Sequence, residues 1–256
     1  MSDLPHISPL LVRWFTWYSR RVIQRHFHSL RISTSVPWGD LGGRPVVLYT
    51  NHASWWDPLV GLVVINAKFN ARQLYAPIDA VMLQRYKMFS KMGFFGVEKD
   101  TRKGAADFLR QSTNILTKPD AILAVTAQGR FADVRERPVG IKRGLGHLSL
   151  RVPDAVYIPV CIEYVYWEEK LPEILVRFGS PVKLSDEKDL ETNLVRLERG
   201  LETTQDDLAA RSVSRDIAAF SILVSGRAGL GGIYDRWRTL RATLRGEEFK
   251  TEIGSV

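Results

Sequence analysis

Short apolar runs alternate with amphipathic segments of helical length along most of the chain, and this alternation restricts the fold more than any other feature. Four runs rich in β-branched residues read as strands: 43–50, 121–127, 155–167 and 173–182. Four segments between or beside them read as helices: 59–69, 81–93, 100–120 and 142–152. Two shorter pieces read as extended: 72–80 and 94–99. We therefore predict an α/β fold with a central, mostly parallel or mixed sheet flanked by helices.

The segment from Ser8 to Leu30 mixes aromatic residues and arginines at the three- and four-residue spacing of a helix. Ser8 is a suitable cap and Pro9 a suitable first residue for that helix. Tryptophan and tyrosine favour the headgroup level of a bilayer, where arginine meets anionic lipid. We favour an in-plane membrane helix over the alternative, an amphipathic helix docked on the protein's own core.

No linker-like stretch or internal repeat interrupts the remaining chain. We therefore predict two regions: an N-terminal amphipathic membrane-surface helix in residues 1–35, and a single α/β domain in residues 36–256. That domain includes a polar helical segment at 184–216. It ends in a basic, aromatic, helical C-terminal tail at about 231–250, which resembles the N-terminal segment in character.

The net charge of +8 points to a polyanionic neighbour, either nucleic acid or an anionic membrane surface. No RNA-binding signature accompanies that charge, so we expect the membrane and not nucleic acid. Since no secretory signal and no run of about 18 apolar residues is present, we expect a cytoplasmic protein, peripheral on the cytoplasmic face of a membrane. The single cysteine, Cys161, cannot form an internal disulfide, and its apolar flanks predict a buried structural residue.

The sequence Asn51–Asp57 carries the candidate chemistry, because His52 and Asp57 follow a predicted buried strand with four residues between them. One continuous helix would place them on different faces. They meet if the chain loops after the strand and a helix begins near Asp57, with Asp57 as its cap and Pro58 at its first position. A carboxylate bonded to one imidazole nitrogen leaves the other to accept a proton from a hydroxyl. The alternative is a helix-capping Asp57 beside an unrelated loop histidine.

Four blocks between Val46 and Val160 resemble, in order, those of the glycerolipid acyltransferase family, whose best-known members acylate glycerol 3-phosphate and lysophosphatidic acid. Asn51, His52 and Asp57 match its Asn-His-four-residues-Asp block. The other three matches are GFFGVEK from Gly93 to Lys99, VTAQGRF around Gly129, and YIPV with Pro159.

The resemblance implies an O-acyltransferase in which His52 is the general base, oriented by Asp57. The acyl donor would be an acyl-CoA or an acyl carrier protein, as co-substrate, with a lysolipid or glycolipid hydroxyl as acceptor. No cofactor and no metal is implied. The implied substrate-binding residues are Asn51, Lys99, Gln128, Gly129, Arg130, Arg135, Arg137 and Lys142.

Three positions depart from the family pattern. Gln128 replaces a glutamate, so it keeps hydrogen bonding but not charge. Arg130 stands where threonine is usual, and Phe131 where arginine is usual. The basic residues of loop 128–143 therefore read either as a phosphate-binding set or as a solvated basic loop.

Two other functions compete with acyl transfer. One is an acyl-ester hydrolase, although the chain has no Gly-x-Ser-x-Gly elbow. The other is a non-catalytic basic module that binds a membrane or RNA. His26, His28 and His147 have no partner at metal-ligand spacing, so we predict structural or surface positions for them.

Overall fold

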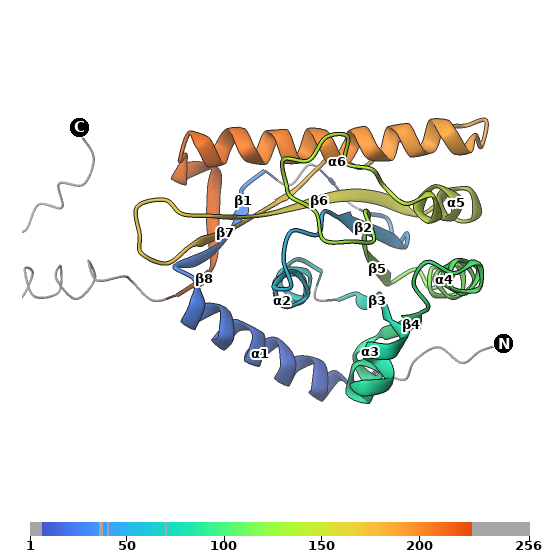
Figure 1. Cartoon of the computed structure of the whole chain (residues 1–256), viewed down its shortest axis with the longest axis horizontal. Coiled ribbons are helices and arrows are strands. Elements are labelled where there is room, and N and C mark those ends of the chain that lie inside the picture. Colours follow the sequence, from blue (N-terminus) through green and yellow to red (C-terminus); the bar gives the residue numbers. More distant parts are fainter. Residues whose placement is uncertain (1–6, 36–37, 40, 70, 227–256) are drawn as a thin grey trace, which may run out of the picture.

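The computed structural model describes residues 7–35, 38–39, 41–69 and 71–226, and it is built around one eight-stranded sheet (Figure 1). The strand order is β4-β3-β5-β2-β6-β7-β1-β8. The strands are β1 (Ser29–Ser33), β2 (Val46–Thr50), β3 (Gln73–Asp79), β4 (Phe94–Val97), β5 (Ala121–Thr126), β6 (Val156–Val165), β7 (Glu173–Phe178) and β8 (Phe220–Ser225). The helices are α1 (Pro9–His26), α2 (Asp57–Lys68), α3 (Ala80–Arg85), α4 (Arg102–Ile115), α5 (Arg143–Arg151) and α6 (Leu190–Val213), with 3₁₀ turns η1 (Lys87–Met92) and η2 (Ile217–Ala219).

The sheet is mixed and mostly parallel, which confirms the predicted fold class. Strands β4, β3, β5, β2 and β6 all run in one direction. β7 is antiparallel to β6, β1 is parallel to β7, and β8 is antiparallel to β1. The carboxyl ends of the five parallel strands therefore share one edge, where α/β folds place their ligands.

Helices cover both faces of the sheet, so each face has its own core. Val46 and Leu48 of β2 belong to one apolar cluster, whereas Val47 and Tyr49 belong to the other, as the two-residue period of a strand requires. The first cluster packs against α1 and α2, and the second against α4, α5 and α6 (Figure 1). Burial on both faces is typical of a parallel sheet.

Helix α1 begins as predicted but ends earlier than Leu30. Ser8 caps it by accepting a hydrogen bond from the Leu11 N–H, and Pro9 is its first residue. The helix ends at His26, and Ser29–Ser33 is a fully buried strand between β7 and β8. The helical prediction for Ser29 and Leu30 is therefore wrong, because pairing with two strands outweighs a local helical pattern.

Two further elements differ from the sequence predictions. The predicted helix 81–93 is divided at Tyr86 into α3 and the 3₁₀ turn η1, although it ends at Gly93 as expected, with a φ of 95°. Strand β8 lies in a segment where the sequence pattern predicts neither a helix nor a strand. The predicted tail at 231–250 lies outside the described residues.

Candidate active site

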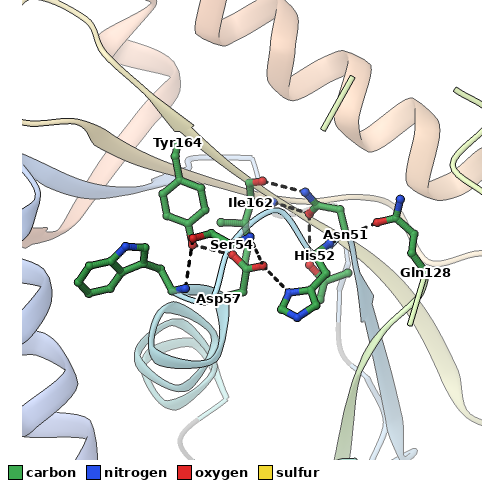
Figure 2. Close-up of polar contacts among 9 residues, drawn as sticks. Asn51, His52, Ser54, Asp57, Gln128, Ile162 and Tyr164 are labelled. Carbon is green, nitrogen blue, oxygen red and sulfur yellow. Dashed lines mark hydrogen bonds and ion pairs between the residues drawn. The ribbon is translucent and has the colours of Figure 1, made fainter. Parts of the chain in front are cut away.

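The loop between β2 and α2 brings His52 and Asp57 together. β2 ends at Thr50 and α2 begins at Asp57, so the loop turns the chain back at the carboxyl edge of the sheet. The His52 Nδ1 atom lies 2.7 Å from Asp57 Oδ2 (Figure 2). With Nδ1–H donated to the carboxylate, Nε2 is the ring nitrogen that carries the lone pair. The pair therefore has the geometry of an oriented general base.

Asp57 does not cap α2, and this corrects the prediction. The N-cap is Trp56, and Asp57 is the first residue of the helix. The loop closes tightly, since the Asp57 N–H donates to the Ser54 carbonyl over 3.1 Å. This turn directs the carboxylate back to the Ser54 N–H, 3.0 Å from Oδ2, instead of to the N–H groups of the helix. The conformation thus serves the histidine contact and not the helix end.

Tyr164 is a third member of this group and was not among the residues predicted from the sequence. Its phenol donates to Asp57 Oδ1 over 2.6 Å, so the buried carboxylate accepts three hydrogen bonds (Figure 2). Burial raises the pKa of the Tyr164 phenol far above its ordinary value, and the adjacent Asp57 charge raises it further. The phenol therefore remains a donor at every working pH. The available signal was a tyrosine near the end of the strand beside β2.

Asn51 and Gln128 hold the start of the loop by hydrogen bonds, Asn51 to β6 and Gln128 from the segment after β5. The Asn51 side-chain amide donates to the Ile162 carbonyl and its Oδ1 accepts from the Ile162 N–H, both over 2.9 Å. Gln128 Oε1 accepts from the His52 N–H over 3.3 Å, while its Nε2 donates to the Val139 carbonyl over 3.1 Å. Both side chains are buried, so they position the backbone where the loop begins, at Asn51 and at the His52 N–H.

Phe131 lies against the imidazole. The two ring centroids are 4.2 Å apart with the planes tilted by 31°. The His52 side chain is 18% exposed, whereas Phe131 is 59% exposed. The backbone holds this arrangement, because the Ala132 N–H donates to the His52 carbonyl over 2.9 Å. An exposed apolar ring therefore lies against the His52 imidazole.

The predicted basic residues are all at the surface, and each forms an ion pair with a carboxylate. The pairs are Lys99–Asp79, Arg130–Glu136, Arg135–Asp133, Arg137–Asp206 and Lys142–Asp100. The pairing is close enough that Arg135 lowers the pKa of the Asp133 carboxyl well below its usual range. Exposed pairs of this kind contribute little to stability, because water screens them.

Gly129 joins β5 to this basic loop in a left-handed conformation, with a φ of 64°. The stem of Lys142 lies over it, 3.1 Å from the position that a Cβ atom would take. The turn places Gln128 inside the protein and Arg130 outside. The loop therefore favours glycine at position 129, because other residues rarely adopt this left-handed conformation.

The remaining candidates are structural or lie at the surface. Cys161 is a buried free thiol, and burial raises its pKa well above the usual value. His147 is exposed on α5, and the His26 ring stacks at a tilt on Trp56 with the centroids 5.2 Å apart. Within the described residues, no three His, Cys, Asp or Glu side chains gather in a way that could hold a metal ion.

Comparisons with known proteins give a likeness of fold. No protein-family model matches the chain, and no curated protein matches its sequence. Among solved structures, it is similar to the 1-acyl-sn-glycerophosphate (LPA) acyltransferase PlsC from Thermotoga maritima, with a TM-score of 0.56 and 12% sequence identity. The match covers 78% of this chain and 80% of that one. At this identity, the likeness shows that the two proteins share a fold.

Proposed function

We propose that this protein is an O-acyltransferase that moves a fatty acyl group from a thioester, either an acyl-CoA or an acyl carrier protein, to a hydroxyl of a lipid. The observation that carries the proposal is the hydrogen-bonded His52–Asp57 pair at the carboxyl edge of the parallel strands. The order of the sequence blocks and the fold shared with a glycerophosphate acyltransferase support it.

The proposed reaction uses His52 as the base. Asp57 accepts the Nδ1–H, so Nε2 can take the proton from the acceptor hydroxyl as its oxygen attacks the thioester carbonyl. The carbon–oxygen bond forms, and the tetrahedral intermediate then expels the thiolate as the carbon–sulfur bond breaks. The imidazolium returns its proton to the thiolate. Asn51 and Gln128 act as positioning residues in this scheme, because their side chains hold the backbone beside the base.

Replacement of His52 tests the proposal directly. His52→Ala is expected to lower the rate of acyl transfer about 10²–10⁴-fold, the usual contribution of a general base. His147→Ala is the matched control, since that histidine is exposed on α5 and should leave the rate unchanged. Thiol release and product ester are measured together on variants whose circular dichroism matches wild type. Near-normal turnover by a folded His52→Ala variant would remove the proposed mechanism.

The hydrolase alternative lacks support from the loop geometry. Ser54 is the hydroxyl residue inside the loop, but its Oγ accepts from the Trp56 N–H over 3.3 Å. Asp57 bonds the Ser54 backbone and not its hydroxyl. The same assay separates the two reactions, because hydrolysis yields free fatty acid without an acceptor and acyl transfer yields an ester.

We also propose that the enzyme works on an anionic membrane surface, which α1 contacts with its outer face. Toward the protein, α1 buries Thr16, Ser19 and Ile23. Its tryptophans, Trp14 and Trp17, are exposed, which is the reverse of an ordinary helix docked on a core. Within the described residues, no helix is long and apolar enough to cross a bilayer.

A second element extends this surface. The Phe15 ring meets Phe89 of η1 edge-on at 5.9 Å, so α3 and η1 lie beside the start of α1 (Figure 1). Neither Pro9–His26 nor Ala80–Met92 contains an acidic residue. Exposed apolar side chains on α3 and η1 are Val81, Met82, Tyr86 and Met88. The cations of the two segments are Arg13, Arg20, Arg21, Arg25, Arg85, Lys87 and Lys91. A surface with only positive charge and exposed apolar groups fits anionic lipid.

Vesicle co-sedimentation tests this surface. Each basic residue contributes about 1 kcal/mol near anionic lipid, and salt screens that contribution but not the burial of aromatic rings. We expect salt to weaken binding only in part, and the double variant Trp14→Ser/Trp17→Ser to remain in solution. Phe15 is left unchanged because it contacts η1.

The control carries two serines for exposed apolar residues of α6, Val195 and Val213. This helix covers the other face of the sheet (Figure 1). Wild type that fails to bind the vesicles, or a tryptophan variant that binds as well as the α6 control, would contradict the membrane proposal.

A further inference from the structure

We infer that the acceptor presents its reacting hydroxyl on an uncharged head, as a monoacylglycerol or an alkyl glycoside does, and not on a phosphomonoester. The inference rests on the proposed acyl transfer and names the class of acceptor for the same site. Two observations carry it: the ion pairing of the basic residues around the carboxyl edge, and the apolar ring beside the base.

The basic residues that a phosphate would need are already neutralised. Arg130 binds Glu136 with both terminal nitrogens, and Arg135 binds Asp133 with Nε and Nη2. In both pairs the carboxylate belongs to the same short loop, so a substrate cannot remove it. Lys99 and Lys142 pair with Asp79 and Asp100, at 3.4 and 3.3 Å.

A phosphomonoester would have to displace these carboxylates and then remain beside them. Two like charges in contact repel each other, and the repulsion is screened less at a protein surface than in bulk water. The tethered carboxylate also competes at a high effective concentration, because it is part of the same loop. The net charge of the five pairs is zero, and nothing in their arrangement favours a dianion.

Within the described residues, an aromatic ring, and no unpaired cation, lies against the imidazole. The ring centroids of Phe131 and His52 are 4.2 Å apart, and Phe131 is 59% exposed. Trp55, in the same loop as His52, is also exposed and stacks on Trp56 with the centroids 4.8 Å apart. Aromatic faces of this kind pack against the C–H faces of glycerol or a sugar, whereas a phosphate placed against them loses water and gains no hydrogen-bond partner.

The test compares two acceptors that carry the same acyl chain, monoacylglycerol and lysophosphatidic acid, in uncharged detergent micelles with palmitoyl-CoA and palmitoyl carrier protein as donors. We expect wild type to show a kcat/KM at least about tenfold higher for monoacylglycerol. A preference for lysophosphatidic acid would overturn the inference while leaving the proposed acyl transfer standing. Absence of transfer to every acceptor with both donors would overturn both.

Two variants sharpen the comparison. Glu136→Gln releases Arg130, and a new charge-assisted hydrogen bond to phosphate is expected to raise the relative kcat/KM for lysophosphatidic acid about tenfold. Phe131→Arg is expected to act in the same direction, with Phe131→Leu as its uncharged counterpart.

Asp186→Asn is the control, since it breaks the exposed Lys183–Asp186 pair between β7 and α6, and neither residue belongs to loop 128–143. It should leave the preference between the two acceptors unchanged. If Glu136→Gln and Phe131→Arg also leave it unchanged, the loop does not select the acceptor and the inference falls.

Discussion

The hydroxyl of Tyr164 offers the sharpest test of the proposed catalytic geometry, because it contacts Asp57 and not His52 itself. Tyr164→Phe removes one donor from a buried carboxylate and keeps the ring, which packs against Phe27 with the centroids 5.8 Å apart. A hydrogen bond to a charged group contributes about 1.5–3 kcal/mol, so we expect the free energy of unfolding to fall by that amount.

The same change should also lower the rate of catalysis. With one donor lost, the Asp57 carboxylate keeps two hydrogen bonds, to the His52 ring and to the Ser54 N–H, and is held less firmly against the imidazole. We expect kcat to fall by up to about tenfold with little change in KM, since a loss of about 1.36 kcal/mol in transition-state stabilisation is a factor of ten in rate.

The assays are urea denaturation and steady-state kinetics, with Tyr49→Phe as the matched control. Tyr49 is also buried, but its phenol donates to a neutral acceptor, the Leu197 carbonyl, over 3.0 Å. Tyr49→Phe should therefore lower stability without changing kcat. If Tyr164→Phe lowers stability and leaves kcat unchanged, Tyr164 is only structural. If it changes neither quantity, the bond to Asp57 contributes nothing and the reasoning is refuted.

Three further outcomes are expected. Asp57→Asn should lower turnover about 10²–10⁴-fold by losing the imidazole orientation, and retention of full activity would contradict the role of the carboxylate. Gly93→Ala should cost more than about 1–3 kcal/mol of unfolding free energy, because its φ is 95° and a Cβ atom would lie 2.2 Å from the Leu74 carbonyl oxygen. Gly43→Ala, with a φ of 68° and open space, should cost clearly less by the same denaturation assay. Cys161 should react with iodoacetamide only when the protein unfolds, since the thiol is buried and its pKa is raised; rapid labelling of native protein would contradict this.

Sequence patterns were sufficient where local periodicity decides structure. The alternation of strands and helices predicted the α/β class, and Ser8 with Pro9 and Gly93 marked two element ends. Strand β1 escaped prediction because its central Arg31 reads as part of a basic helix. In the structure that arginine is buried and binds Glu173 of β7 over 3.1 Å, a partner 142 residues away.

The candidate site likewise contains one contact that the sequence predicts and others that only the tertiary structure creates. The contact between His52 and Asp57 could be predicted, because the two residues are five positions apart after a predicted strand and a short loop brings its own ends together. The hydrogen bond from Tyr164 to Asp57 joins residues 107 positions apart in the sequence, and the one from Asn51 to Ile162 joins residues 111 positions apart. Only the parallel pairing of β2 with β6 creates both contacts.

The charges of the basic loop are a second case in which the tertiary structure decides what the sequence leaves open. The sequence determined that cations are frequent in residues 128–143. The structure pairs one of them, Arg135, with a neighbour two residues away, Asp133. The tertiary structure decided that Arg137 meets Asp206 of α6 and that Lys142 meets Asp100. Composition gives the number of charges along the chain. The electrostatic potential that a substrate experiences depends on how those charges are paired in the folded protein. That pairing depends on which distant segments the sheet brings together.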